Sequence, residues 1–279
     1  MAMIYMKHYF SLLPLLVFFT TIFLMLLNMR VNSSSISSFS YNGFTMDEED
    51  LIFQGDAHLL STHHLFNSNV VQLTKTNRSG EPQKNTVGRV LYYAPIQLYN
   101  TMGRVSNFES NIKFILTKPS SKPADGLAFF IAPINNRKIP MDSKGGFLGL
   151  FNETTAFNNP SNQILAIEFD TYNNTWDPNY AHIGININSI ESLEHVRWEI
   201  KEGQEFNARI THDPFTGNLN VTSFYSGGDK HYDVSYVFNL RGVLPEWVVV
   251  GLTASSGNDG VQVHTILSWD FRSTLVLIE

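Results

Sequence analysis

The sequence contains no cysteine, so neither disulfide bonds nor thiol chemistry are available to this protein. It also has no basic block: 19 lysine and arginine residues stand against 25 aspartate and glutamate residues, and the formal net charge is −6 at pH 7. Proteins that bind nucleic acid gather positive charge on one face, so nucleic acid is not an expected partner. The Gly-x-Ser-x-Gly motif of serine hydrolases does not occur either.

Long apolar runs are absent after residue 30, but one lies near the N-terminus. It extends from Phe10 to Leu27 and is followed by Arg30 and a serine-rich stretch. A basic start, an apolar stretch and small residues predict a secretory signal peptide with its cleavage region over residues 1–38. The run is also long enough to act as an uncleaved membrane anchor, and this alternative stays open. We expect residues 39–279 to enter the secretory pathway, to be extracellular or vacuolar, and to have no membrane span after cleavage.

The acceptor triplet for N-linked glycans, Asn-x-Ser/Thr, fits this location and predicts a glycoprotein. Such triplets also occur by chance, so they agree with secretion without establishing it. The triplets begin at Asn32, Asn77, Asn152, Asn173 and Asn220.

Helical periodicity is also missing, because from residue 39 onward apolar residues recur at every second position. Residues 108–116 alternate in this way and predict a strand with one buried face. Turn signals at 213–217 and 226–229 separate similar runs. Residues 126–132 and 164–167 are apolar throughout and predict strands covered on both faces. Many short strands without helices predict a single all-β domain, an antiparallel β-sandwich, and 21 phenylalanines can fill its core.

The isolated charged residues and the tryptophans of the predicted strands are interpreted as structural residues and not as binding residues. The tryptophans of the predicted strands lie on alternating positions, which favours core packing over sugar stacking. We predict surface positions for Lys84, Arg89 and Arg104, and core positions for Trp198, Trp247 and Trp269.

Two carboxylates mark the end of the second fully apolar segment. Glu168 and Asp170 are two residues apart, so they share one face of the predicted strand. Carboxylates next to a core are costly unless they are paired, and no basic residue adjoins them in the sequence. A bound cation is therefore the natural partner.

The loop that follows supplies further ligand atoms. Asp177 is a third carboxylate, Asn174 and the Tyr172 carbonyl offer neutral oxygens, and His182 offers an imidazole nitrogen. Oxygen donors suit Ca²⁺, whereas carboxylates with one imidazole suit Mn²⁺ or a similar transition-metal ion. Spacing alone leaves open the alternative of an acidic loop that faces water.

At these residues the sequence resembles the metal-binding signature of the legume lectins. The signature runs through Ala-Ile-Glu-Phe-Asp-Thr-Tyr at 166–172, Asn174, Trp-Asp-Pro at 176–178 and His-Ile-Gly-Ile at 182–185. The resemblance covers the mature chain, and we expect one legume-type lectin domain over 39–279. Further matching segments lie at 39–44, 124–130, 145–152, 243–247 and 267–269.

The resemblance implies a jelly-roll sandwich with two ions beside the sugar site. Glu168, Asp170, Asp177 and His182 would bind the transition metal. Asp170, Asp177, Asn174 and the carbonyl of Tyr172 would bind Ca²⁺, so that the two aspartates bridge the ions.

The resemblance also implies which residues bind carbohydrate. Asp125, following a cis peptide bond, would accept hydrogen bonds from sugar hydroxyls, and the backbone N–H of Gly146 would donate one. The Asn174 amide would donate another, the ring of Tyr172 would stack on the sugar, and Asn258 in the last loop would contribute a donor. That loop is rather short, which favours a mannose/glucose preference over galactose or N-acetylgalactosamine.

Two departures from the family pattern need comment. Asn186 stands where the family usually has aspartate, but this position is no direct ligand, so we expect metal binding to survive. Asn173 adjoins Asn174, so a glycan there would crowd the site, and we expect Asn173 to be unmodified.

Two other functions compete with carbohydrate binding. One is a storage or defence protein of the lectin fold that has lost sugar binding. The other is a β-sandwich glycoside hydrolase with a Glu-x-Asp-x-x-Glu motif, but Asn173 replaces the second glutamate and one required carboxylate is missing. We therefore expect no enzyme, with glycans and glycoproteins as partners and a homodimer or homotetramer by resemblance.

Overall fold

The protein is described here by a computed structural model that covers residues 17–21, 36–45, 48–61, 68–117, 122–157 and 159–278. The chain separates into two units, Met1–Ser34 and Ser35–Glu279. In the first unit, residues 17–21 form a turn of helix, and most of the predicted signal segment, with Asn32, lies outside the described residues. Within the described ranges, no helix has the length and apolar character needed to cross a membrane.

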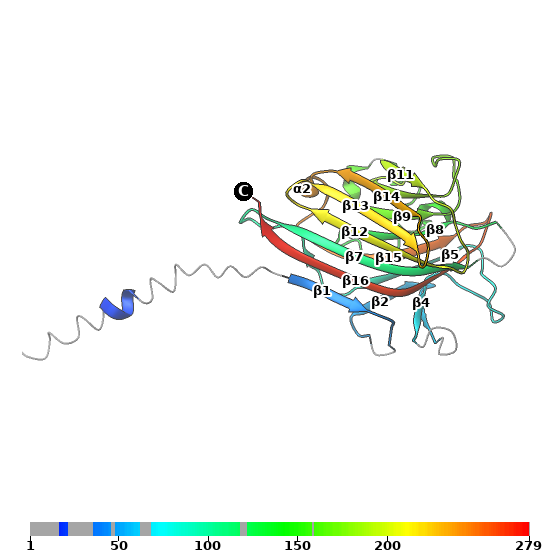
Figure 1. The fold of residues 1–279 in the computed structure, drawn as a ribbon, viewed down its shortest axis with the longest axis horizontal. Coiled ribbons are helices and arrows are strands. Elements are labelled where there is room, and N and C mark those ends of the chain that lie inside the picture. The colour runs from blue at the N-terminus through cyan, green and yellow to red at the C-terminus, as the bar shows by residue number, and fades with distance from the viewer. Residues whose placement is uncertain are drawn as a thin grey trace, which may run out of the picture. The chain divides into compact units, whose positions relative to one another are not determined.

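The second unit is built almost entirely from antiparallel strands (Figure 1). A short helix, α2 (Leu240–Val243), and two 3₁₀ turns, η2 (Gly145–Phe147) and η3 (Pro160–Asn162), interrupt them. The strands are β1 (Ile36–Tyr41), β2 (Leu51–Gly55), β3 (His58–Leu60), β4 (Val70–Gln72), β5 (Thr86–Tyr92), β6 (Ile96–Gln97), β7 (Arg104–Thr117), β8 (Gly126–Pro133), β9 (Leu165–Asp170), β10 (His182–Ile187), β11 (Glu194–Arg197), β12 (Glu205–Asp213), β13 (Asn218–Tyr225), β14 (His231–Val237), β15 (Trp247–Ser256) and β16 (Val263–Leu277).

The strands form two eight-stranded sheets. The back sheet has the order β14-β13-β12-β7-β16-β4-β3, with β1 beside β16. The front sheet has the order β11-β10-β9-β8-β15-β5-β2, with β6 beside β15. Strands distant in sequence become neighbours in both sheets, as expected of a sandwich with crossing connections, and the predicted all-β sandwich is confirmed.

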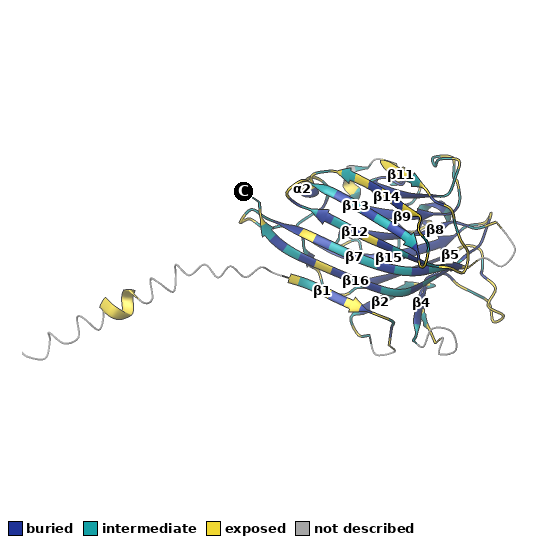
Figure 2. Cartoon of the chain, viewed as in Figure 1, coloured by how far each residue is buried: buried dark blue, intermediate teal, exposed yellow. Residues whose placement is uncertain are grey.

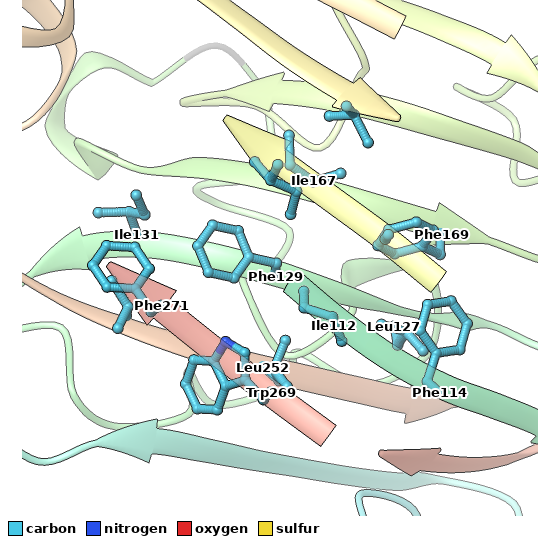
Figure 3. Packing of buried hydrophobic residues seen from close by; sticks show 14 of the residues in the cluster. Ile112, Phe114, Leu127, Phe129, Ile131, Ile167, Phe169, Leu252, Trp269 and Phe271 are labelled. Carbon is cyan, nitrogen blue, oxygen red and sulfur yellow. The ribbon is translucent and has the colours of Figure 1, made fainter. Parts of the chain in front are cut away.

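Alternating burial follows the predicted period of two in the back sheet. β7, β12 and β13 switch between buried and more exposed positions along their lengths (Figure 2). The inward side chains meet those of the front sheet in one aromatic-rich core. Figure 3 shows Phe114 and Phe169 in this core, with their ring centroids 5.1 Å apart. The ring centroid of Phe206 lies 5.3 Å from that of Phe114.

A second apolar layer covers the outer face of the front sheet. It explains why β8 and β9 are buried at nearly every position, as the uniformly apolar runs at 126–132 and 164–167 predicted. Segments between β8 and β9, and after β10, supply the covering side chains. The buried members of this layer are Leu91, Ala128, Phe130, Ala132, Leu148, Leu150, Phe151, Ala156, Ile164, Ala166, Ile190 and Val249.

Arg89 of β5 lies beneath this layer, so the prediction of a surface position for it is wrong. Its side chain is only 1% exposed. One guanidinium nitrogen donates to the carbonyls of Lys138 (3.1 Å) and Asn136 (3.4 Å), and another donates to the carbonyl of Gly149. The guanidinium carbon lies 4.5 Å from the ring centroid of Phe130. Loop carbonyls without a strand partner need donors when they are buried, and arginine provides several at once.

The positions of Trp198, Trp269 and Lys84 agree with the predictions, whereas those of Trp247 and Arg104 differ. Trp198 and Trp269 are in the core, at 2% and 0% exposed, whereas Trp247 is 44% exposed. Trp247 begins β15 and pairs only with the two-residue strand β6 at the margin of the front sheet, so its ring reaches solvent. Lys84 is exposed, and Arg104 is half-buried.

Candidate functional site

β9 and its neighbour β10 bring the acidic residues and the histidine together. The two strands are antiparallel, and His182 pairs directly with Asp170. Phe169 points into the core between the sheets, so Glu168, Asp170 and His182 point to the outer face of the front sheet. The strand pairing thus joins residues that are separated by the whole 171–181 loop.

Three of the predicted metal ligands form a tight group at this edge. One ligand atom each from Glu168, Asp177 and His182 lies within 4.8 Å of the others. The Nε2 atom of His182 is 3.0 Å from Oε1 of Glu168, and both side chains are almost fully buried. The Ser192 hydroxyl donates to the same Glu168 oxygen and lies 3.3 Å from Oδ1 of Asn186. Asn186 is therefore one side chain removed from the group of Glu168, Asp177 and His182.

The loop after β9 arranges the remaining oxygens. Asp170 accepts a hydrogen bond from the Tyr172 amide, and Asp177 accepts one from the Asn174 amide, each at 2.8 Å. The Oδ1 atom of Asn174 is buried and receives no hydrogen bond within the described part of the chain. A buried amide oxygen without a donor is a suitable ligand for a hard cation.

The electrostatics of this group are unfavourable without a cation. Burial and the charge of Glu168 raise the pKa of Asp170 well above its usual range, and they raise the pKa of Asp177 to about 7. Burial acts to lower the pKa of His182, but its hydrogen bond to Glu168 and the nearby carboxylate charges outweigh burial and raise the pKa. The carboxylates thus resist ionisation together, and a divalent ion would relieve that cost.

Asp125, the predicted sugar acceptor, lies next to this acidic group. The peptide bond between Ala124 and Asp125 is cis, as the family resemblance implied. The Asp125 carboxylate accepts a hydrogen bond from the Gly257 amide at 2.5 Å. Its backbone carbonyl accepts bonds from the amide and hydroxyl of Thr171, at 2.9 and 3.0 Å. Burial raises the pKa of Asp125 to about 6, so its carboxylate also gains from positive charge nearby.

Gly146 lies in η2, against the side chain of Asn174. A Cβ atom placed on Gly146 would lie only 2.3 Å from the Asn174 side-chain oxygen, so no other residue fits without displacing Asn174. The structure therefore places the backbone of Gly146 and the amide of Asn174 in direct contact.

Tyr172 and Asn258 mark the rim of the same region. The Tyr172 hydroxyl donates to Asp259 at 3.3 Å, and the ammonium of Lys122 lies 4.1 Å from the centroid of the Tyr172 ring. The side-chain oxygen of Asn258 accepts a hydrogen bond from Asn85 at 2.6 Å. The predicted carbohydrate residues thus converge from four segments of the chain.

Sequence reasoning missed several residues that support this region. Gly257 and Thr171 hold Asp125, and Lys122 covers one face of Tyr172. No spacing rule connects these positions, because they come from separate loops. Arg89 did carry a signal, since a lone arginine within an apolar strand has to find buried acceptors.

Comparisons with known proteins agree with this architecture. The family model described as Legume lectin domain matches residues 36–277. The mannose-specific lectin CML-2 of Centrolobium microchaete is 48% identical over 244 residues, covering 86% of this chain and 95% of that protein. Agglutinin-2 of Cladrastis kentukea is 47% identical over 267 residues, covering 94% and 89%. The solved structure of lectin UEA-II complexed with galactose has a TM-score of 0.77 at 37% identity, covering 85% of this chain and 98% of that one.

Proposed function

The chain belongs to the legume lectin family, and from this premise we propose that it binds a mono- or oligosaccharide at a site organised by two metal ions. The observation that carries the proposal is the convergence of Asp125, Gly146, Tyr172, Asn174 and Asn258 beside the buried acidic group. Because the matched family and relatives are lectins, the glycoside hydrolase alternative is no longer needed.

We propose that a transition-metal ion such as Mn²⁺ is held by Glu168, Asp170, Asp177 and His182. Three of these side chains cluster, and within the described part of the chain no lysine or arginine forms an ion pair with them, which supports this assignment. When bound, the ion supplies positive charge that fixes the carboxylates in their ionised form.

Ca²⁺ would be held by Asp170, Asp177, Asn174 and the carbonyl of Tyr172. The buried Asn174 oxygen that lacks a donor is the structural support for this part of the proposal. An all-oxygen set of carboxylates, amide and carbonyl matches the preference of Ca²⁺.

The sugar would be held by complementary donors and acceptors. The ionised Asp125 carboxylate accepts from hydroxyl groups, while the Gly146 N–H and the Asn174 amide donate to sugar oxygens. The ring of Tyr172 packs on the apolar face of the sugar, and Asn258 adds a donor at the rim. With its oxygen on Ca²⁺, Asn174 presents its amide nitrogen in a fixed direction, so ion binding and sugar binding are coupled.

A mannose/glucose preference is proposed over a galactose preference. It is supported by the short loop around Asn258 and by the similarity to a lectin named as mannose-specific. A galactose-type preference is the competing proposal, because a structurally similar lectin was solved in complex with galactose. Each preference predicts a different hit on a glycan array.

Residues 1–38 are proposed as a signal peptide and cleavage region that sends residues 39–279 into the secretory pathway, as an extracellular or vacuolar glycoprotein. β1 and the family match both begin at residue 36, so the cleavage point itself is best determined by N-terminal sequencing. A homodimer or homotetramer is proposed by resemblance to the family.

Glycan-array binding of the mature protein tests this proposal. The protein is assayed with Ca²⁺ and Mn²⁺, and again after acid and EDTA treatment. Binding to one sugar class that disappears on stripping and returns with the ions is the expected result. Absence of binding with both ions shown to be bound would contradict the proposal and favour a storage or defence protein of this fold.

A further inference from the structure

The segment that carries Gly146 has no strand of its own. Residues 134–149 follow β8 and lie over the outer face of the front sheet, with only the short turn η2 as regular structure. Within the segment, the Leu148 amide donates to the Gly145 carbonyl at 3.0 Å, and the Gly149 amide donates to the Ser143 carbonyl at 2.7 Å. Most of its remaining buried carbonyls need donors from elsewhere.

Side chains of the front sheet supply those donors. Ser255 donates to the Gly145 carbonyl at 2.5 Å, and Thr253 donates to the Leu148 carbonyl at 2.8 Å. Arg89, which pairs with Thr253 across β5 and β15, donates to carbonyls at both ends of the segment. Ser255 and Thr253 are two residues apart on β15, so all three donors share the outer face of the sheet.

The Ser255 bond acts on the peptide unit that matters for sugar binding. The carbonyl of Gly145 and the N–H of Gly146 belong to the same planar peptide group. A donor that fixes the direction of this carbonyl therefore also fixes the direction of the Gly146 N–H, which points the opposite way. Two glycines flank this peptide, so the side chains beside it restrain its rotation little. Its orientation depends on the two donors to the Gly145 carbonyl, the Leu148 amide within the turn and the Ser255 hydroxyl of the sheet.

We infer that Ser255, Thr253 and Arg89 are positioning residues of the sugar site: they orient the Gly146 N–H by holding the carbonyls of 136–149. This inference rests on the proposed function. Their side chains reach the predicted sugar contacts through the segment, and the backbone carbonyl of Ser255 also accepts a hydrogen bond from the Asp125 amide at 2.9 Å, which Ser255→Ala leaves in place. Burial lowers the pKa of the Arg89 guanidinium to about 9, so it keeps its charge and all its donors at neutral pH.

Ser255→Ala is the first test, and Ser223→Ala is its matched control. Ser223 is also fully buried and donates to a backbone carbonyl, that of Tyr232, at 3.0 Å, but it lies in β13 of the back sheet. Loss of one buried hydrogen bond should weaken sugar binding by about five-fold in Ser255→Ala and not at all in Ser223→Ala. Both variants should show a similar fall in melting temperature. Sugar affinity is measured by titration at saturating Ca²⁺ and Mn²⁺.

Thr253 and Arg89 give graded tests of the same idea. Thr253→Val removes the hydroxyl at nearly constant volume and should weaken sugar binding, whereas Thr253→Ser keeps the donor and should restore it. Arg89→Lys leaves one ammonium that cannot reach both ends of the segment, so its sugar affinity should fall further. Metal content is measured in each variant and should equal that of the wild type.

Hydrogen exchange of the Leu148 and Gly149 amides measures how firmly the segment is held, whether or not the protein binds sugar. Faster exchange in Ser255→Ala and Thr253→Val than in Ser223→Ala is expected, because the segment loses its external donors. Wild-type sugar affinity and unchanged exchange in the folded Ser255→Ala protein would overturn the inference. If the wild type bound no sugar, the proposed function would fail, and the exchange comparison would still decide whether these donors hold the segment.

Discussion

Phe169 and Asp170 are adjacent in β9, yet their side chains enter opposite surroundings. Phe169 points between the sheets, where its ring lies 6.1 Å from the ring of Trp198 in an edge-on contact. Asp170 points to the outer face, beside Glu168 and Asp177, and it is 1% exposed. One strand therefore joins an apolar core to a buried cluster of carboxylates that the proposed cations would neutralise.

The difference lies in how each region compensates for burial. Apolar rings leave water at a gain of about 25 cal/mol per Å² and need no partner of opposite charge. Buried carboxylates need partners, and the described residues around Asp170 offer backbone amides and His182 but no lysine or arginine contact. The inter-sheet core is stabilised by apolar contacts alone, whereas the proposed ions would neutralise the acidic group beside the proposed sugar site.

Asp170→Asn should cause the largest loss of sugar affinity, and it should disrupt the acidic group without disturbing the inter-sheet core. The amide keeps the size of the side chain but removes a charge shared by both predicted ions. Loss of a residue that only supports a metal ligand typically lowers metal affinity or activity by about 10- to 100-fold. Asp170 is proposed as a direct ligand, so we expect sugar affinity to fall at least about a hundredfold. Metal content by mass spectrometry and sugar titration measure the two losses.

Asp270→Asn is the control for that variant. Asp270 lies in the back sheet and accepts a hydrogen bond from Asn111 at 2.9 Å. Its neutralisation should leave metal content and sugar affinity unchanged. Equal losses in both variants would mean that net charge, and not the acidic group, governs binding.

Phe271→Ala should have the next largest effect, a loss of folding stability, and it should disrupt the inter-sheet core without disturbing the acidic group. Phe271 is 1% exposed, and Figure 3 shows it on the opposite side of the core cluster from Phe169. Truncation of a buried phenylalanine lowers the free energy of unfolding by about 3–5 kcal/mol. The stabilisation that added Ca²⁺ and Mn²⁺ provide should be the same as in the wild type, because distant effects add.

Urea unfolding with and without the ions measures both quantities for Phe271→Ala. A change in the ion-dependent stabilisation would show that the two regions are coupled through the front sheet. Sugar affinity of the folded variant at saturating ions should match the wild type.

The core was the more predictable of these two regions. Period-two alternation in β7 and uniform apolarity in β8 gave both the strands and their covered faces, because packing rules act on neighbours in sequence. Glu168 and Asp170 gave a cation hypothesis by spacing, but only the family resemblance assigned the ligand and sugar sets. The burial of Arg89 escaped prediction because its acceptors, the carbonyls of 136–149, come close only in the folded chain.

Changes of pH should alter the free energy of unfolding by a smaller amount. Acidification should lower stability through buried His264 and raise it through the buried acidic residues. Burial lowers the pKa of His264 to about 3, against about 6.5 in an unfolded chain. Between these pH values the unfolded state holds the extra proton, so stability present above pH 6.5 is lost as the pH falls. In the ion-free protein, Asp125 and Asp177 have raised pKa values of about 6 and 7, so acidification favours their folded state.

His264→Gln isolates the histidine contribution. In the ion-free wild type, His264 should cost about 1.4 kcal/mol of stability per pH unit between pH 6 and 4, and the variant should lack this term. The measurement is the free energy of unfolding in urea across that range, with wild type and variant compared at each pH. Parallel curves for the two proteins would contradict the assignment of this term to His264.

Asn258→Ala should have the smallest effect and would separate sugar recognition from the ions. Asn258 is exposed at the rim and is in the proposed sugar set but not in the proposed ligand sets. Loss of one hydrogen bond at an exposed position should weaken sugar binding about five-fold, with metal content unchanged. Asn85→Ala is the matched control, because it removes the same Asn85–Asn258 hydrogen bond yet leaves the Asn258 amide in place. Equal loss of sugar affinity in the two variants would assign the effect to loop support, whereas loss in Asn258→Ala alone would place its side chain on the sugar.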